Sequence, residues 1–392
     1  MGRRPHVLQV FQPGIGGVPA YVANIASGLR ELGWRVSVAA PAGHSAAARL
    51  EHVAERQLVI ESSGGWSPVA DARALRALLD FTRREGVDLL HAHSSKASLL
   101  AGMAARRTGR VSVYTPHTWA FQRTGIPLGG APYAAIEAVL ARRCHRRVIA
   151  VSDCEATAAS RWHVVGSGAV QVVRTGLPAA SAPTSRAEAR RRLALDPEQP
   201  VVAWVGRLHR AKRPQDLAPL ATRLRSKARL VALGQDLAGS PEGAALRRAG
   251  GLVLDGADSR LLLGAADLLV LTSAWEALPL CVLEAMQASL PVVAYDVGDL
   301  RAQVIDGGSG FLVRAFDVAE LARRAMLLVE DPALRAALGG AGRRRLDEGF
   351  SYPAMVRSID AAYREAIGPA ASAVPGRRRR APTPAGAAEA RA

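Results

Sequence analysis

The stretch "HVLQVFQPGIGGVPAYVANIASGLRELGWRVSVAA", residues 6–40, decides the fold class. Its two short β-branched runs, residues 6–11 and 34–40, predict strands, and the longer run 18–32 between them predicts an amphipathic helix. The glycine-rich loop "QPGIGG" joins the first strand to the helix. A strand, a helix and a second strand in this order predict a βαβ unit, which belongs to a parallel sheet with helices packed on it.

The same alternation continues along the 392 residues, and a length of this order fits two domains. The predicted strands lie near residues 87–92, 111–115 and 147–151 in the first half, and near 230–233, 251–254, 268–271, 291–294 and 310–313 in the second. Helical patterns fill residues 317–367. The chain is therefore predicted to be α/β, with two doubly wound parallel-sheet domains that face each other across a cleft.

The composition changes between residues 179 and 199, where Ala, Pro, Ser, Thr and Arg predominate. Ser185 and Glu188 have the spacing of a capping box for a short helix in this linker. We expect an N-terminal domain over residues 1–178, the linker over 179–199 and a C-terminal domain over 200–350. A helix at 351–368 is expected to pack back on the N-terminal domain, and the Ala/Pro/Arg-rich tail 369–392 is expected to be disordered.

The net charge of +17 favours anionic partners, which include nucleotides, phospholipid surfaces and nucleic acid. The three cysteines show neither metal-ligand spacing nor a disulfide pattern, as expected in a reducing cytosol. Acidic residues interrupt the most apolar stretch, residues 261–286, so it falls short of the roughly 20 apolar residues of a membrane helix. We therefore expect a cytoplasmic protein.

The stretch "SAWEALPLCVLEAMQASLPVVA", residues 273–294, carries the first chemical signal. We expect Pro279 in the first turn of a helix, where the amides of Leu280 and Cys281 would meet an anion such as phosphate. Glu276 and Glu284 would then flank the helix start and accept hydrogen bonds from sugar and ribose hydroxyls. A helix cap and a surface carboxylate are the alternative interpretation of these two residues.

A second signal, "GRLHRAKRPQDL" at residues 206–217, follows another predicted strand. Gly206 would let the backbone pass close to a ligand, and Arg207 and Lys212 can neutralise a diphosphate. Either cation alone would be an ordinary surface residue. Beside two carboxylates at a neighbouring strand end, the pair predicts a site for an anion and a sugar.

These two motifs resemble those of the family four retaining glycosyltransferases, which have the GT-B fold of two facing Rossmann-like domains. The resemblance covers about residues 7–367, nearly all of the chain outside the tail. It implies that a Gly-Arg-Leu motif followed by Lys binds the diphosphate of the donor, and that two Glu separated by seven residues bind the sugar and the ribose. In the first half, "GGVPAYVANIASGLRELGWRVSV", "HAHSSKASLLAGMAAR" and "YTPHTWAF" are similar to segments of bacterial members that build surface polysaccharides or lipid-linked glycans.

The resemblance assigns roles residue by residue. It implies His117 against the donor sugar, Gly16 and Gly17 in the acceptor-side loop, and either a ligand contact or a structural role for His93. The implied catalytic residues are Glu276, Arg207, Lys212 and His117. The implied binding residues are Glu284, Gly206, Leu280, Cys281, Gly16, Gly17 and His93.

The chain departs from the family pattern at several positions. Ala277 and Ser289 stand where the family usually has Gly, and Thr175 stands before Gly176 where Asn is customary. The turn after "LVAL" keeps only one glycine, in Gly234-Gln235-Asp236. Ala277 would tighten the donor loop if its backbone needed a positive φ. These changes bear on donor choice and activity more than on the fold.

The resemblance implies a retaining glycosyltransferase that moves a sugar from a nucleotide diphosphate donor, with a UDP-sugar favoured and GDP-mannose second. No Asp-x-Asp pair occurs, so a divalent metal is expected to be unnecessary and no cofactor is expected. Arg207, Lys212 and the helix start would stabilise the departing diphosphate. The acceptor would be a hydroxyl of a glycan, a lipid-linked glycan or a small molecule.

One further segment suggests a partner. "AIEAVLARRCHRRV", residues 135–148, places four arginines beside Ile136, Val139 and Leu140; these arginines are Arg142, Arg143, Arg146 and Arg147. A basic amphipathic helix of this kind is expected to touch anionic lipid at the inner face of the cell membrane. An ordinary solvated helix face is the alternative.

Three other functions fit parts of the sequence. A sugar-nucleotide epimerase of the same fold would keep the donor motifs but need no acceptor. A dinucleotide-dependent oxidoreductase is disfavoured because "GIGG" lacks the G-x-G-x-x-G spacing. A nucleic-acid-binding protein would rest on charge alone, since no zinc, helix-turn-helix or aromatic RNA motif occurs, so no nucleic-acid partner is expected.

Overall fold

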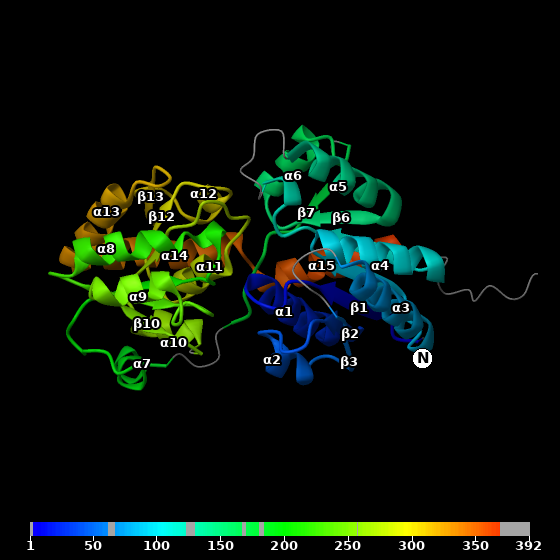
Figure 1. The fold of residues 1–392 in the computed structure, drawn as a ribbon, viewed down its shortest axis with the longest axis horizontal. Coiled ribbons are helices and arrows are strands. Elements are labelled where there is room, and N and C mark those ends of the chain that lie inside the picture. The colour runs from blue at the N-terminus through cyan, green and yellow to red at the C-terminus, as the bar shows by residue number, and fades with distance from the viewer. Residues whose placement is uncertain are drawn as a thin grey trace, which may run out of the picture.

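Two parallel sheets, each covered by helices, form two lobes that lie side by side (Figure 1). The structure is a computed structural model that describes residues 3–61, 67–122, 130–166, 170–179, 184–256 and 258–368. The tail expected to be disordered, residues 369–392, lies outside the described residues. The two-domain α/β architecture expected from the sequence is confirmed.

The first sheet has the strand order β3-β2-β1-β4-β5-β6-β7, and every pair in it is parallel. Its strands are β1 (His6–Phe11), β2 (Arg35–Ala40), β3 (Arg56–Val59), β4 (Leu89–His93), β5 (Val111–Thr115), β6 (Arg147–Ala150) and β7 (Val170–Val172). In the register, Gln9 of β1 lies opposite His91 of β4, and His93 lies opposite Thr115 of β5. Side chains of these residues therefore share one face of the sheet.

Helices cover both faces of this sheet, as in a doubly wound fold. They are α1 (Gly17–Glu31), α2 (Ala47–Glu51), α3 (Pro68–Arg84), α4 (Ser95–Thr108), the 3₁₀ turn η1 (Ala120–Gln122), α5 (Gly130–Cys144) and α6 (Asp153–Arg161). The second and third long helices, α3 and α4, lie side by side, and α4 also contacts α5. Apolar residues of these three pack on one sheet face and those of α1 on the other.

The second sheet has the order β10-β9-β8-β11-β12-β13, again wholly parallel. Its strands are β8 (Val201–Val205), β9 (Arg229–Leu233), β10 (Leu252–Leu254), β11 (Leu268–Leu271), β12 (Val292–Tyr295) and β13 (Gly310–Val313). Its short 3₁₀ turns are η2 (Arg210–Lys212) and η3 (Pro214–Asp216). Its α-helices are α7 (Arg186–Arg192), α8 (Leu217–Leu224), α9 (Pro241–Arg248), α10 (Ser259–Ala265), α11 (Leu280–Gln287), α12 (Leu300–Gln303), α13 (Val318–Glu330) and α14 (Pro332–Gly349).

The segment expected to link the domains contains α7, whose Ser185 caps it by accepting a hydrogen bond from the Glu188 amide as the capping box predicts. This helix packs on α10 of the second lobe. Arg190 of α7 is 2% exposed and donates to Asp267 at 3.0 Å. The short helix is thus held to the second lobe by a buried ion pair.

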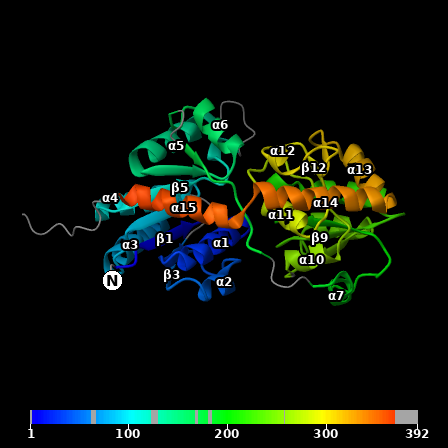
Figure 2. The ribbon, with the colours of Figure 1, turned by 180° about the vertical axis from the view of Figure 1, so that it is seen from behind.

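The chain crosses between the lobes twice, and the two crossings touch. Leu177 and Ser351 form an isolated parallel bridge, and the Gly176 amide donates to Met355 Sδ at 3.2 Å. After the second crossing, α15 (Tyr352–Ile367) runs along the first lobe and packs on α1 and β5 (Figure 2). Trp34 Nε1 donates to Asp360 of α15 at 2.6 Å. The last helix of the chain is therefore part of the first lobe.

Candidate functional site

Several residues with a positive φ follow the carboxyl ends of strands in both lobes. Ser94 follows β4 with φ 144°, His117 and Thr118 follow β5 with φ 53° and 95°, and Asp236 follows β9 with φ 63°. Arg213, at the end of η2 in the loop after β8, has φ 47°. In residues other than glycine this conformation costs free energy, and proteins retain it mainly at functional sites. The strand ends expected to carry the site are therefore also the strained ones.

The second lobe brings Lys212 and Glu276 together as a direct ion pair. Ser273 donates a hydrogen bond to the same Glu276 oxygen at 2.6 Å. Burial alone lowers the pKa of Lys212, but the charge of Glu276 and the hydrogen bond between them outweigh it, and the net pKa shift is upward. Lys212 is thus held positive at the end of β11, where an anionic group would meet it.

Glu284 lies further along α11 and is held by Ser259 of α10, whose hydroxyl donates to it at 3.0 Å. Burial raises the pKa of Glu284, and the Ser259 hydrogen bond and the charges of Arg260 and Arg49 oppose that rise. Arg49 belongs to α2 of the first lobe. The carboxylate is therefore within electrostatic reach of a cation on the facing lobe.

The start of α11 corrects one expectation. Pro279 is the residue before the helix, with φ −67° and ψ 124°, and the first helical residue is Leu280. Pro279 is extended and ends the preceding loop, so the first turn of α11 begins with Leu280 and Cys281. Their amides belong to the first turn and have no acceptor within the helix. Burial raises the pKa of the Cys281 thiol to about 12, so the thiol stays protonated.

Glycines allow the strand ends of the second lobe to approach one another. A Cβ on Gly234 would lie 2.2 Å from the Gly206 carbonyl oxygen, and one on Gly206 would lie 2.8 Å from the Trp204 ring. Gly298, with φ 57°, backs on Glu276: a Cβ there would lie 1.9 Å from the Glu276 carbonyl oxygen. Side chains at these positions would displace Glu276 and the Arg207 loop, so the glycines position the charged residues.

The glycine loop of the first lobe faces this cluster. A Cβ on Gly16 would lie 3.8 Å from Arg207 Cδ, and one on Gly17 would lie 3.9 Å from Leu280 Cδ1. Gly16 has a φ of 96° and is the residue before α1. The loop that opens α1 therefore lies against Arg207 and the start of α11, where the two lobes meet. This junction between the lobes is the candidate cleft.

His117 follows β5 and lies beside α1, the helix that the glycine loop opens. Its ring packs edge-on against Tyr21 of α1, with centroids 4.7 Å apart. The Thr118 amide donates to Glu155, and the amide of Cys154 donates to Asp299 of the second lobe at 3.2 Å. Asp299 adjoins Gly298, which backs on Glu276. Residues adjacent to His117 thus contact the segment of the second lobe that backs on the Glu276 backbone.

The other predicted positions behave differently. His93 is completely buried and hydrogen-bonds His117 at 3.1 Å, so it reaches the cleft only through that residue. Ala277 does not have a positive φ, and the expected tightening of the donor loop does not arise. Ser289 has a φ of 57°, a left-handed conformation that glycine adopts more readily, as the resemblance described above expects. Thr175 is buried.

Sequence reasoning missed several residues of the cleft. Tyr21, Ser273, Gly298 and Asp299 touch His117, Glu276 or their neighbours. Tyr21 is 2% exposed, and among the described residues its hydroxyl has no hydrogen-bond partner. An aromatic residue one turn inside the helix that follows the glycine loop was the available signal. Asp299 gave no signal, because its partner lies on the other lobe.

The described residues contain neither a metal-binding cluster nor a membrane-spanning helix. In those ranges no three His, Cys, Asp or Glu side chains gather closely enough to hold a metal ion. Across the same residues, each helix is too short or too polar to cross a membrane.

Comparisons with known proteins agree with this architecture. The family model of glycosyltransferase family 4 matches residues 15–180, and that of glycosyl transferases group 1 matches residues 185–345. A D-inositol 3-phosphate glycosyltransferase of Frankia alni is 30% identical, over 94% of this chain and all of its own length. A protein of the same name from Salinispora arenicola is also 30% identical, over 92% of this chain and 90% of its own.

Solved structures show the same fold. HepE of Anabaena, in complex with UDP-glucose, has a TM-score of 0.77 at 22% identity, over 91% of this chain and 99% of that one. Sucrose-phosphate synthase of Thermosynechococcus elongatus has a TM-score of 0.75 at 22% identity, over 92% and 99%. Two matching family models, full-length relatives and these neighbours lead to one conclusion. The chain belongs to family 4 of the glycosyltransferases, has the GT-B fold and is an enzyme that transfers glycosyl groups.

Proposed function

We propose that the cleft binds a nucleotide diphosphate sugar and transfers its sugar, with retention at the anomeric carbon, to a hydroxyl group of an acceptor held by the first lobe. The observation that carries this proposal is the convergence of Arg207, Lys212, Glu276 and Glu284 at the strand ends of the second lobe, facing the Gly16–Gly17 loop. Two cations and two carboxylates suit a ligand with a diphosphate between two polyhydroxylated rings.

The diphosphate would lie against Arg207, Lys212 and the first amides of α11. Lys212 and Arg207 are close enough to affect each other electrostatically. Glu276 forms an ion pair with Lys212. Binding of a diphosphate would give Lys212 a second anionic partner and release a Glu276 oxygen for the sugar hydroxyls. Charge that builds on the leaving diphosphate is then stabilised by groups already in place, without a metal ion.

The two rings of the donor would meet the two carboxylates. Glu276 accepts hydrogen bonds from the sugar hydroxyls, and Glu284 accepts them from the ribose. His117 faces the sugar from the first lobe, and the glycine loop leaves room for the acceptor. Closure of the two lobes would exclude water and so limit hydrolysis of the donor.

The transfer itself would follow a front-face route. The bond from the anomeric carbon to the diphosphate oxygen breaks, and the bond to the acceptor oxygen forms on the same face. The acceptor proton passes to an oxygen of the leaving diphosphate. Because the leaving group takes this proton, no side chain has to act as a strong base. This agrees with the carboxylates of Glu276 and Glu284, which already accept hydrogen bonds from serine hydroxyls.

We favour a UDP-sugar as donor, since the solved neighbour HepE binds UDP-glucose. The acceptor is a glycan, a lipid-linked glycan or a small molecule, and inositol phosphates are included because the relatives are named for them. Incubation with nucleotide sugars and an acceptor panel, with EDTA present, tests this directly. Proton NMR of the product should show the anomeric configuration of the donor. An inverted product, or transfer that requires added metal, would contradict the proposal.

The same assay separates transfer from isomerisation. A reaction with donor alone would give an isomerised nucleotide sugar if the chain were an epimerase. Our proposal expects the donor to remain unchanged, or to be slowly hydrolysed, until an acceptor is added.

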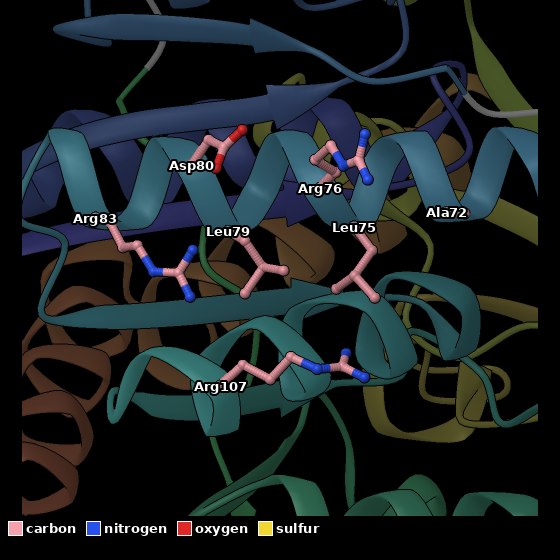
Figure 3. Close-up of a pocket in the computed structure, with 7 residues that line it drawn as sticks. All are labelled: Ala72, Leu75, Arg76, Leu79, Asp80, Arg83 and Arg107. Carbon is pink, nitrogen blue, oxygen red and sulfur yellow. The ribbon is translucent and has the colours of Figure 1, made fainter.

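We also propose that the outer face of α3, α4 and α5 rests on an anionic membrane. Tyr133, Ile136 and Val139 of α5 are 46%, 50% and 56% exposed, an apolar patch on a protein with a net charge of +17. A groove of about 420 Å³ lies between α3 and α4 (Figure 3). In it, Leu75 and Leu79 point from α3 toward α4. Three arginines and one acidic residue complete its charged lining: Arg76, Arg83, Arg107 and Asp80.

In the structure, fewer of the four arginines in residues 135–148 are available to bind lipid than the sequence suggested. The helix α5 ends at Cys144, and Arg147 begins β6 and pairs with Glu365 of α15 at 2.7 Å. Arg142 donates to the Val164 carbonyl at 3.0 Å. Arg142 and Arg147 thus interact with other groups of the protein, and Leu140 is buried. Arg143 and Arg146 remain exposed beside the apolar patch.

Vesicle flotation tests the membrane proposal. The protein should float with liposomes that contain anionic lipid at low salt and stay behind with neutral ones. The double variant Ile136→Ser, Val139→Ser should lose most of this binding. Replacement of the exposed Leu327 on α13, which lies on the other lobe, is the matched control. Equal flotation of wild type and double variant would contradict the proposal.

A further inference from the structure

A row of polar side chains crosses the core of the first lobe. Gln9, His91, His93, Thr115 and Tyr363 are each 0% exposed. Their neighbours on the same sheet face, such as Val7, Leu89 and Val113, belong to the apolar core. Polar groups buried without partners cost several kcal/mol, and an apolar sheet face would pack without that cost. The row therefore needs an explanation beyond folding.

These side chains satisfy one another in a single hydrogen-bonded chain. Thr115 bonds His91 Nε2 at 2.9 Å, and His91 Nδ1 bonds the Tyr363 hydroxyl at 2.5 Å. Gln9 Nε2 donates to the same hydroxyl at 3.0 Å. The other atom of that amide, Gln9 Oε1, lies 2.8 Å from His93 Nε2, and His93 Nδ1 lies 3.1 Å from His117 Nε2. The chain thus begins in the core and ends at His117 in the cleft.

The direction of each hydrogen bond follows from the groups that can donate. Burial lowers the pKa of His93 well below its ordinary value, so its ring is neutral and has one N–H. That N–H is on Nε2, because Gln9 Oε1 can only accept. His93 Nδ1 must then accept, and His117 Nε2 must donate. The chain therefore places a hydrogen on His117 Nε2.

Tyr363 supplies the link that orients Gln9. Its hydroxyl accepts from the Gln9 amide nitrogen, which turns the amide oxygen toward His93. Burial raises the pKa of Tyr363 well above its ordinary value, so the hydroxyl keeps its proton and donates it to His91. The ring itself is fixed by edge-on contacts with Trp34 at 5.3 Å and His91 at 5.4 Å.

We propose that Tyr363, on α15, is a positioning residue for His117: through Gln9 and His93 it sets the orientation and tautomer of that histidine. The proposal rests on the proposed function in one respect, which is that His117 faces the donor sugar. Because Tyr363 lies on a helix that follows the second crossing between the lobes, a segment far from β1 in the sequence completes this side of the site.

The first test is kinetic and uses Tyr363→Phe, which removes the hydroxyl and keeps the ring. We expect kcat to fall about tenfold, with the KM for the donor nearly unchanged, because losing an orienting partner behind a histidine costs about this much. The control is Tyr352→Phe, at the start of the same helix, which also removes a tyrosine hydroxyl; that hydroxyl donates to the Asn24 carbonyl at 2.8 Å and does not contact the chain. Its kcat should stay within about twofold of the wild type.

A second variant shows whether the residues act as a unit. Gln9→Met has a similar volume and breaks the chain at its middle. If Tyr363 acts through Gln9, the double variant should lose no more kcat than the more affected single variant. Multiplicative losses would mean that the two residues act separately and would overturn the proposal.

The direct readout is independent of activity. Nitrogen-15 NMR of histidine-labelled protein at a pH above 8, with His117→Gln to assign the signal, reports which ring nitrogen of His117 carries hydrogen. Wild type and Tyr352→Phe should show the Nε2–H tautomer, and Tyr363→Phe should show a mixture. An unchanged His117 signal in Tyr363→Phe would overturn the proposal, whether or not the enzyme transfers sugar. Absence of glycosyl transfer with the expected tautomers would instead count against the proposed function alone.

Discussion

Ser289 follows α11 with a φ of 57° and is exposed. Its amide donates to the Met286 carbonyl at 3.0 Å, and the Leu290 amide to Ala285 at 2.9 Å, as in a helix end that favours glycine. We predict that Ser289→Gly raises the free energy of unfolding by about 1 kcal/mol, since a left-handed conformation costs other residues about that much. Urea unfolding checks this.

The matched control for this prediction is Ser289→Ala, which keeps the backbone strain. It should leave the stability unchanged within about 0.5 kcal/mol, because the exposed hydroxyl makes no hydrogen bond among those described. If Ser289→Gly proved no more stable than Ser289→Ala, the strain argument would be wrong.

Single residues were the part of the site that the sequence predicted best. Arg207, Lys212, Glu276 and Glu284 were chosen because charged residues near strand ends suit a diphosphate and two rings, and the structure brings them together. The direct pairing of Lys212 with Glu276 was not foreseen. It depends on how η2 turns toward the loop after β11, and residue spacing contains no information about that turn.

Between α4 and β5, His145 forms a buried bridge. Its ring bonds Ser98 at 2.7 Å and Ser112 at 2.9 Å, and burial lowers the pKa of His145 from 6.5 to about 3. In the unfolded chain this histidine binds a proton near pH 6.5, whereas in the folded protein it stays neutral at that pH. The free energy of unfolding therefore falls as the pH drops below about 6.5. We predict a loss of about 1.4 kcal/mol from this residue between pH 7.5 and 5.5.

Other buried histidines also lower the stability as the pH falls. The contribution of His145 is therefore measured as the difference in pH dependence between the wild type and a variant without this ring. His145→Gln keeps hydrogen-bonding groups but has no titrating ring. Its free energy of unfolding should vary less between the two pH values than that of the wild type, by about 1.4 kcal/mol. Equal pH dependence in both proteins would show that His145 does not remain neutral.

The short helix α7 depends on Arg190. This side chain, 2% exposed, donates to Asp267 and to the Ala265 carbonyl, both at 3.0 Å. We predict that Arg190→Ala lowers the free energy of unfolding by about 3 kcal/mol, because it removes one partner of a buried ion pair. Arg186→Ala removes a half-exposed partner of the same carboxylate and should cost less than about 1 kcal/mol. Similar losses in both variants would contradict this assignment.

At the level of elements, the hydrophobic periodicity and composition of the sequence predicted most strands. They did not predict two of the short ones. Strands β3 and β7 were missed, because β3 is largely exposed and β7 has three residues, so neither shows the apolar run of a central strand. The strand predicted near residues 147–151 is confirmed as β6, Arg147–Ala150. The basic segment at residues 135–148 therefore spans the end of α5 at Cys144 and the start of that strand.

The two lobes are joined where both crossings meet. A Cβ on Gly176 would lie 2.5 Å from the Tyr352 amide nitrogen and 2.6 Å from the Ser351 carbonyl carbon. Backbone atoms cannot move aside as a flexible side chain can, so Gly176→Ala should push the crossings apart. We predict a loss of about 2 kcal/mol in stability, measured by thermal or urea unfolding.

Gly349, the last residue of α14, provides the comparison because a Cβ there meets nothing within 4 Å. Gly349→Ala should be neutral or slightly stabilising, as expected for alanine in a helix. A destabilisation equal to that of Gly176→Ala would show that the region, rather than the contact, is sensitive.

At the scale of the whole molecule, the sequence predicted two facing domains and a donor site on the second. It could not predict which residues of the first lobe complete the cleft. Tyr363 and Gln9 are separated by 354 residues and meet only because α15 returns to the first sheet. Likewise, Cys154 and Asp299 meet across the cleft. Contacts of this kind depend on how the lobes are arranged, which no local pattern encodes.

Isothermal titration calorimetry with UDP and with UDP-glucose tests the central assignment most directly. Glu276→Gln should weaken binding of UDP-glucose without weakening that of UDP, because Glu276 is assigned to the sugar. Glu284→Gln and Lys212→Ala should weaken both, by about 1.5 to 3 kcal/mol for each charge-assisted contact removed. Unchanged affinities in all three variants, or loss of UDP binding in Glu276→Gln, would contradict the account.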